Sequence, residues 1–255
     1  MDPRVKKQII ISSVFILVIL IIAFGVYFFY FRETPTCSDN IKNQGEEGID
    51  CGGPCVPCEL KNLKNIEISW AKALPTQNQN YDLVARIKNV NQNEGSREFS
   101  YEFQLYNLNN KLIASRSGTN FILSREEKYI IEQKVFTPET PAIIKLNIGQ
   151  TNWEKISDYN PPALQVFDKK FESSNEIPIF WRASAIVKNS SYSVYKSVKI
   201  AIVLFDAKDE PLAVNLSELD KIDAGQERYF SAPWHFSFVG SVAKVDVETY
   251  VDLFK

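Results

Sequence analysis

An almost unbroken apolar run, Ile9–Phe31, limits what this chain can be more than any other feature of its sequence. The hydrocarbon core of a bilayer is about 30 Å thick and is crossed by roughly 20 residues of α-helix. The run consists mainly of Ile, Val, Leu and Phe. It is therefore long enough to cross a membrane, and the lipid bilayer is the first partner that the sequence predicts.

The charges beside this run predict its orientation. Arg4, Lys6 and Lys7 precede it, whereas Arg32 and Glu33 roughly cancel on the far side. The more basic flank of a span stays inside, so residues 1–8 are expected to form a cytosolic tail. The C-terminus is then extracytoplasmic, and the chain is a single-pass protein of the cell membrane.

A cleaved secretory signal is the alternative interpretation. Its apolar region would be shorter and would end at a small-residue cleavage site. Here the run leads into Phe28–Phe31 without an Ala-x-Ala pattern. The sequence therefore favours an uncleaved signal anchor, and under either interpretation the rest of the chain is exported.

All four cysteines lie just beyond the run, in a stalk expected at residues 35–60: Cys37, Cys51, Cys55 and Cys58. Gly, Pro, Asn and Asp dominate this stretch, so it cannot bury enough apolar surface to fold without covalent support. Four cysteines allow three pairings, and the sequence does not choose among them. We expect two disulfides in an oxidising exterior.

Three sharper interpretations of this stretch compete. A zinc site would need two close cysteine pairs, whereas here one cysteine precedes a cluster of three. The Cys55–Cys58 spacing is typical of thiol–disulfide exchange, but no βαβ unit follows it. Oxygen-bearing side chains spaced through a Gly-containing loop make calcium an alternative to a solvated polar loop; they are Asp39, Asn43, Glu46 and Asp50.

The same stretch resembles a short cysteine module of prokaryotic surface proteins. The module reads Cys-x-Asp-Gly-x-x-Asn-x-x-Glu and then Asp-Cys-Gly-Gly-x-Cys, and Asn40 stands where it has Gly. The resemblance implies an exported location and no particular activity.

Beyond the stalk, apolar side chains alternate with polar ones. Leu83, Ala85 and Ile87 form one such series, and Phe99–Leu105 forms another. A period of two is typical of half-buried antiparallel strands, and no helical spacing is sustained after Phe31. We therefore expect an all-β ectodomain.

This ectodomain is expected to be one unit used twice, because motifs return after about 100 residues. Ile87–Asn89 returns as Val187–Asn189, Phe103–Asn107 as Ile202–Asp206, Glu127–Tyr129 as Glu227–Tyr229, and Phe136 as Phe236. About seven short strands per copy predict two tandem immunoglobulin-like β-sandwiches at 65–156 and 163–255, joined at Ser157–Pro162. Neither copy contains cysteine, so both depend on packing.

The strand Phe103–Asn107 reads Phe-Gln-Leu-Tyr-Asn and is similar to the signature of FxLYD domains, which are extracytoplasmic β-sandwiches of prokaryotes. A Lys-Asn turn typically precedes that strand, as Lys88-Asn89 does here. In this chain Asn107 replaces the Asp of the family. The resemblance implies a scaffold without a known chemistry.

No pattern for catalysis is present. His235 is the one histidine, which leaves no multi-His metal site, and no nucleophile elbow, phosphate loop or dinucleotide fingerprint occurs. We expect no enzyme and no cofactor. The net charge of −2 and the lack of a basic stripe also argue against nucleic acid.

The tryptophans are the remaining candidates for a binding patch. Trp70 and Trp181 fall at inward positions of their strands and are expected in the core, whereas Trp153 and Trp234 lie near strand ends.

Two functions follow from these expectations. The first is a membrane-anchored module of the cell envelope that displays two sandwiches to a protein or glycan partner. The alternative is an accessory subunit of an envelope assembly, such as a secretion or pilus machine.

Overall fold

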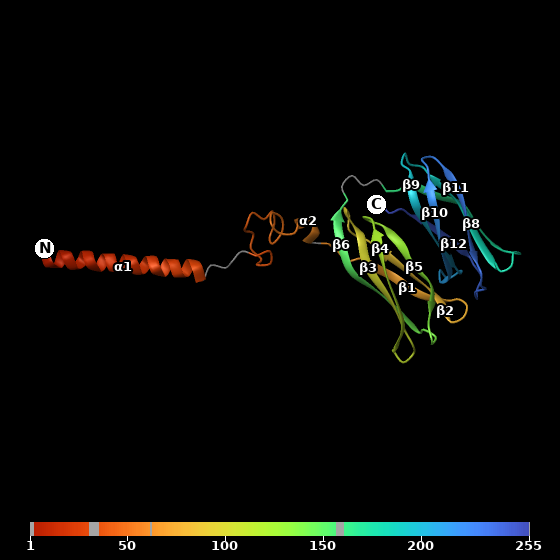
Figure 1. The fold of residues 1–255 in the computed structure, drawn as a ribbon, viewed down its shortest axis with the longest axis horizontal. Helices are drawn as coiled ribbons and strands as arrows, with labels where there is room; N and C mark the ends of the chain where they lie inside the picture. The colour runs from red at the N-terminus through yellow and green to blue at the C-terminus, as the bar shows by residue number, and fades with distance from the viewer. Residues whose placement is uncertain (1–2, 31–35, 62, 157–160, 255) are drawn as a thin grey trace. The chain divides into compact units, whose positions relative to one another are not determined.

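The computed structural model describes residues 3–30, 36–61, 63–156 and 161–254 of the chain, which forms two compact units, Met1–Asn62 and Leu63–Lys255 (Figure 1). The first unit holds helix α1 (Pro3–Tyr30), the cysteine module and the single turn α2 (Cys58–Lys61). The helix begins before the predicted span, because Pro3 suits a first helical turn. Phe31, the predicted end of the span, lies outside the described residues, as do residues 157–160 of the predicted joint Ser157–Pro162.

Helix α1 is long and apolar enough to cross a membrane over Pro3–Phe28. None of its most apolar window is buried against the rest of the chain. A core helix of a soluble protein would be mostly buried, so α1 is either a membrane anchor or a signal sequence.

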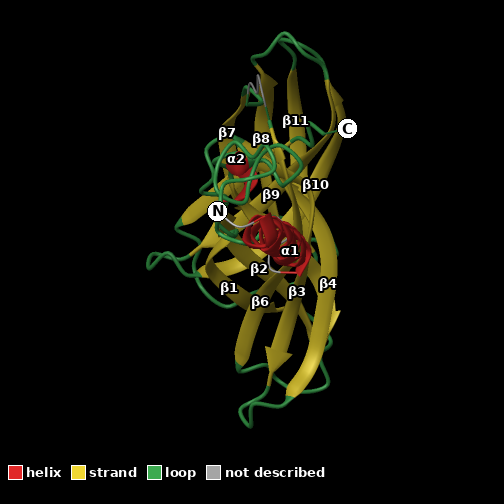
Figure 2. Ribbon diagram, turned by 90° about the vertical axis from the view of Figure 1, so that its left-hand side faces the viewer, coloured by secondary structure: helices red, strands yellow, loops and turns green. Residues whose placement is uncertain are grey.

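The described residues of the second unit form strands and no helix (Figure 2). Its first half contains β1 (Glu67–Pro75), β2 (Asn80–Lys88), β3 (Glu94–Tyr106), β4 (Leu112–Ile122), β5 (Glu127–Phe136) and β6 (Ile143–Lys155). Its second half contains β7 (Leu164–Ser173), β8 (Trp181–Asn189), β9 (Tyr195–Phe205), β10 (Pro211–Ile222), β11 (Glu227–Trp234) and β12 (Lys244–Tyr250). The described residues thus form six strands in each half, where the turn spacing predicted about seven.

The strands form four antiparallel sheets of three, which close in pairs. Sheets β1-β2-β5 and β4-β3-β6 enclose a core that includes Leu83 and Phe103, both fully buried. Sheets β7-β8-β11 and β10-β9-β12 enclose a second core that includes Val187 and Ile202. The predicted all-β fold of two tandem β-sandwiches is confirmed.

The two halves repeat one another in strand register. Glu127 pairs with Lys88 in the first sandwich, and Glu227 pairs with Lys188 in the second. The sheet order is the same in both halves. A bulge in β5 uses an additional residue, so Phe136 still pairs with Asn80 at the end of β5, whereas Phe236 lies beyond the end of β11.

A third apolar cluster joins the two sandwiches face to face. The outer face of β1-β2-β5 packs on the outer face of β10-β9-β12 through Leu74, Val84, Val203 and Phe205, all buried. The middle strands β2 and β9 are therefore covered on both faces. The four sheets follow one another as four layers, with these two in the middle.

We predicted that Trp70 lies in the core of its own sandwich. It lies instead in this third cluster. The register shifts between Ile68 and Trp70, which pair with Ile87 and Arg86 respectively. Such a bulge turns the side chain to the opposite face of the sheet. Trp70 consequently packs against Phe205 of the second sandwich, edge to face at 6.4 Å between ring centres.

Candidate functional site

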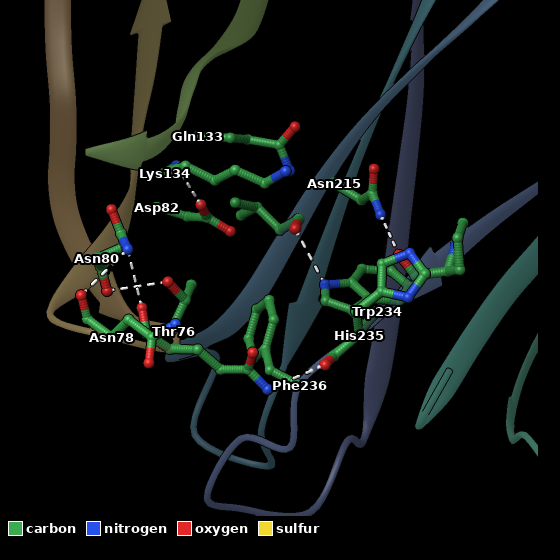
Figure 3. A pocket seen from close by; sticks show the side chains of 13 residues that line it. Thr76, Asn78, Asn80, Asp82, Gln133, Lys134, Asn215, Trp234, His235 and Phe236 are labelled. Atoms are coloured by element: carbon green, nitrogen blue, oxygen red, sulfur yellow. Dashed lines mark hydrogen bonds between the residues drawn. The ribbon is translucent and has the colours of Figure 1, made fainter. Parts of the chain in front are cut away.

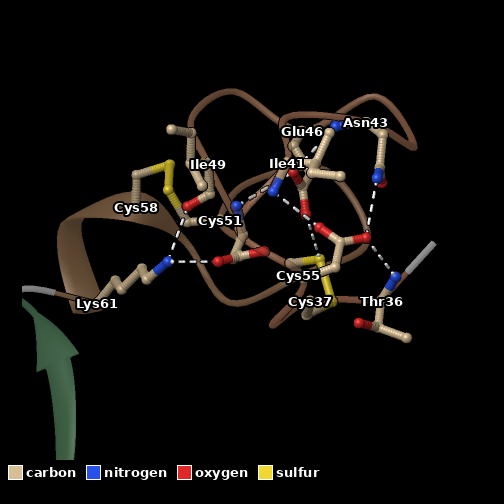
Figure 4. The surroundings of a disulfide bond; sticks show 12 residues. Thr36, Cys37, Ile41, Asn43, Glu46, Ile49, Cys51, Cys55, Cys58 and Lys61 are labelled. Carbon is tan, nitrogen blue, oxygen red and sulfur yellow. Dashed lines mark hydrogen bonds and ion pairs between the residues drawn. A yellow bond between two sulfur atoms is a disulfide. The ribbon is translucent and has the colours of Figure 1, made fainter. Parts of the chain in front are cut away.

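The cysteine module contains two disulfides, Cys37–Cys55 and Cys51–Cys58 (Figure 4). The sequence predicted two bonds but could not assign the pairing. No cysteine is free, so all four positions are structural.

The four side chains predicted as alternative calcium ligands are engaged with the module itself. Asp39 accepts the N–H groups of Thr36 and Ile41 and the amide of Asn43, which lower the pKa of its carboxyl. The hydrogen bond from the Asn43 amide contributes most to this lowering of the Asp39 pKa. The side chain of Glu46, almost fully buried, accepts the backbone N–H groups of Asn43 and Asp50.

Asp50 is buried and fixes the far side of the loop. Its carboxylate accepts the backbone N–H of Asn40 at 2.9 Å and forms an ion pair with Lys61 at 3.2 Å. Asn40 has a left-handed backbone, with φ of 60°, a conformation that Gly adopts freely and Asn tolerates. The replacement of Gly by Asn at this position is therefore compatible with the turn.

One group of candidate metal ligands occurs within the described ranges: Cys37, Glu46 and Cys55. The two sulfur atoms are joined in a disulfide and cannot serve as thiolate ligands. The carboxylates of the module brace its loop through the hydrogen bonds above, and the calcium alternative stays a prediction.

A cavity of about 460 Å³ lies between the two sandwiches and is the strongest candidate for a binding site (Figure 3). The first sandwich contributes the β1–β2 turn around Asn78, together with Asp82, Gln133 and Lys134. The second contributes Val214, Asn215 and the segment 233–236, which ends in Phe236. We call this space the inter-sandwich cavity.

Asp82 is the buried acid of the inter-sandwich cavity, only 2% exposed. One carboxylate oxygen accepts the backbone N–H of Lys134 at 2.9 Å, and the other points into the open space (Figure 3). Within the part of the chain that the structure describes, no Lys or Arg lies within 4.0 Å of it as an ion-pair partner. Burial raises the pKa of the Asp82 carboxyl, and the backbone hydrogen bond from Lys134 and the positive charge of its ammonium group offset part of the rise.

Lys134 occupies a bulge in β5. The pairing of β2 with β5 shifts between Tyr81 and Leu83, and Lys134 has a φ of 57°. A left-handed backbone is strained for a lysine. The matching strand β11 pairs with β8 without a shift, and Arg182 occupies the position that corresponds to Asp82. The second copy therefore has neither the acid nor the bulge at this position; the bulge of its sheet lies in β7, where Asp168 has a φ of 52°.

The wall from the second sandwich combines fixed and open groups. Trp234 is buried and donates its indole N–H to Val214, and Asn215 donates to the carbonyl of Pro233. His235 follows the end of β11 and is exposed. The β1–β2 turn of the first sandwich contacts this wall through Gln77, whose side-chain amide donates to the carbonyl of His235 at 3.0 Å.

His235 was the one candidate base in the sequence. Among the residues described, no hydrogen bond joins its imidazole to a serine, a cysteine or a carboxylate. The other tryptophans that were candidates for a binding patch are at least partly buried. Trp153 and Trp181 pack against the cores of their sandwiches, and Trp234 is more deeply buried than either.

Sequence reasoning missed Asp82, Gln133 and Lys134. The bulge does not show when the sequences of the two repeats are aligned. Glu127–Phe136 and Glu227–Phe236 have equal lengths and align without a gap. Asp82 gave no signal either, because it lies at an outward position of the alternation in β2, where a polar residue is expected.

Comparisons with known proteins show the following. No family model matches the chain, and no curated protein matches it at a significant level. Among solved structures, the chain is similar to red sea bream transglutaminase at 11% identity, with a TM-score of 0.24. The match covers 75% of this chain and 32% of that one, and at this TM-score it indicates neither a fold family nor an activity. Fold and site define a class: an all-β chain of two packed sandwiches behind an apolar N-terminal helix and a disulfide-bonded module.

Proposed function

We propose that this chain is a single-pass membrane protein that displays its paired sandwiches outside the cell to bind a protein or glycan. The observation that carries the proposal is helix α1, whose apolar window is wholly exposed although it is long enough to span a bilayer. In water that surface would be strongly unfavourable, whereas lipid would cover it. Arg4, Lys6 and Lys7 support a cytosolic N-terminus.

The cysteine module supports the same orientation. Two disulfides in a segment with few buried apolar side chains are typical of an oxidising compartment. We infer that the module is a short exported stalk, as its resemblance to prokaryotic surface modules predicts. The role is binding, without catalysis or a cofactor. The FxLYD-like strands would serve as its scaffold.

The mass and N-terminal sequence of the protein from the membrane fraction test the anchor. The proposal expects the intact chain, with Ile9–Phe31 present and retained in the membrane pellet after alkaline extraction. A mature chain that starts after Phe31 and is released by the extraction would contradict it. The same samples, crosslinked in intact membranes, address the accessory-subunit alternative: that role requires crosslinks to an assembly.

A further inference from the structure

The inter-sandwich cavity carries a ligand assignment that rests on the proposed binding role. A gap left by imperfect packing would be lined by apolar groups. This cavity is lined instead by a buried carboxylate, an ammonium group and several side-chain amides. No hydrogen bond engages the side chains of Gln133 and Lys134 within the described part of the chain. Both side chains are exposed and line the cavity, so they are available to a ligand.

The charges of the cavity limit the kinds of ligand that it can bind. Asp82 disfavours an anion, since its buried carboxylate has no ion-pair partner among the described residues within 4.0 Å. Lys134 disfavours a cation for the complementary reason. A purely apolar ligand would leave both groups desolvated without partners, which is costly. A neutral molecule that donates and accepts hydrogen bonds with the same groups fits best.

Hydroxyl groups have that property. The inward oxygen of Asp82 and the side-chain oxygen of Asn215 are acceptors, and the amide of Gln133 and the ammonium of Lys134 are donors. Phe236 is half-buried at the edge of the wall and offers an aromatic face to the C–H side of a sugar ring. A volume of about 460 Å³ is in the range of small-molecule sites.

The backbone supports a functional origin for the cavity. Bulges and residues with a strained backbone are frequent next to binding sites. Lys134 lies in a bulge and has a left-handed backbone. Its strain and the buried charge of Asp82 each oppose folding. Neither occurs at the corresponding positions of the second copy, where β11 pairs with β8 without a shift.

We propose that the inter-sandwich cavity binds a short neutral saccharide, with Asp82 and Asn215 accepting from its hydroxyls and Gln133 and Lys134 donating to them.

The test is calorimetric titration of the full chain in phosphatidylcholine nanodiscs, because glycosidic detergents would compete. Chitotriose, maltotriose and mannotriose are the probes. We expect one of them to bind, and Gln133→Ala to weaken that binding by about tenfold. Gln150→Ala is the matched control, since Gln150 is exposed on β6 and does not line the cavity; it should leave the affinity unchanged.

Lys134→Gly separates binding from structure. Glycine adopts a φ of 57° without strain, so a purely structural bulge predicts equal or higher thermal stability and nothing more. The proposal expects that stability together with a loss of saccharide affinity of about tenfold. A change in stability alone would count against the assignment.

Three results would overturn the proposal: no binding of any probe at about 10 mM, binding that Gln133→Ala and Lys134→Gly leave unchanged, or displacement of the saccharide by free lysine. The last result would assign the cavity to a zwitterion. These results bear on the ligand and not on the anchor, which the membrane-fraction experiment reads separately.

Discussion

The phenol oxygen of Tyr250, in β12, accepts the backbone N–H of Tyr129, in β5, at 2.8 Å. The Tyr250 hydroxyl in turn donates to Glu248, and the hydroxyl of Tyr129 donates to Asp246 at 2.8 Å. Arg86 completes the network with an ion pair to Glu248 at 2.6 Å. The third apolar cluster is thus bordered by directional bonds, which fix how one sandwich meets the other.

Loss of the Tyr250 hydroxyl should weaken this contact. Tyr250→Phe keeps the ring but leaves the Tyr129 N–H buried without an acceptor, so the free energy of unfolding should fall by about 1–3 kcal/mol. Urea unfolding of the full chain measures it. Tyr229→Phe is the control, because Tyr229 also lies in the second sandwich but is 62% exposed. Its effect should stay below about 0.5 kcal/mol; equal losses would contradict the role of Tyr250.

The same phenols predict a loss of stability in alkali. Burial, the first cause in each case, raises the pKa of Tyr129 and of Tyr250 above the ordinary value of 10.0. A raised pKa means that the folded state holds the proton more tightly, so its contribution is complete below pH 10 and is lost as the pH rises through the folded pKa. Unfolding midpoints between about pH 8 and 11.5 should decline above pH 10. Tyr250→Phe should make the decline shallower; a parallel decline would contradict this.

Asp82→Asn should stabilise the protein at neutral pH. The amide oxygen still accepts the N–H of Lys134, and the cost of a buried charge is removed. Because burial raises the pKa of Asp82 above 3.8, the wild-type chain recovers this stability as the pH falls through the folded pKa. The advantage of the variant, measured by thermal unfolding, should therefore shrink toward pH 4. A variant less stable than wild type at pH 7 would show that the carboxylate is well paired.

A tryptic map without reduction shows that both disulfides form, and a cysteine variant then identifies the pairing. Cleavage after Arg32, Lys42 and Lys61 places Cys37 in one peptide and the other three cysteines in the next. The two peptides should remain linked through Cys55, with Cys51 and Cys58 joined inside the second. Cys58→Ser should then expose Cys51 to a thiol reagent. Labelling of Cys37 or Cys55 in that variant would mean a different pairing.

The duplication was readable in the sequence because its anchors are structural. Asn89 and Asn189 are fully buried, and each donates its amide to backbone carbonyls that close the neighbouring loops. Asn107 and Asp206 each accept two backbone N–H groups in matching turns. Side chains with such fixed bonds are retained in both copies, so a repeat search finds them.

The packing of the copies on one another could not be predicted, since it depends on which outer faces meet. Val203 and Val214 are buried in the contact, whereas the corresponding positions on β3 and β4 are Gln104 and Ser115. Those polar side chains make the outer face of β4-β3-β6 unsuited to a further sandwich. The difference becomes meaningful only once the layers are known.

The inter-sandwich cavity was hidden for a related reason. Asp82 and Lys134 meet because one strand carries a bulge, and the period-two pattern assumes regular pleating. The same assumption placed Trp70 on the wrong face. Alternation predicts strands well, but it does not predict where their register shifts.

Surface labelling of a single added cysteine tests the central claim, that the paired sandwiches are displayed outside. Val239 is 95% exposed in the loop between β11 and β12, so Val239→Cys should react with a membrane-impermeant maleimide on intact cells. The wild-type chain, whose four cysteines are paired, should not react. Labelling of Val239→Cys only after the cells are lysed would place the sandwiches inside and contradict the account.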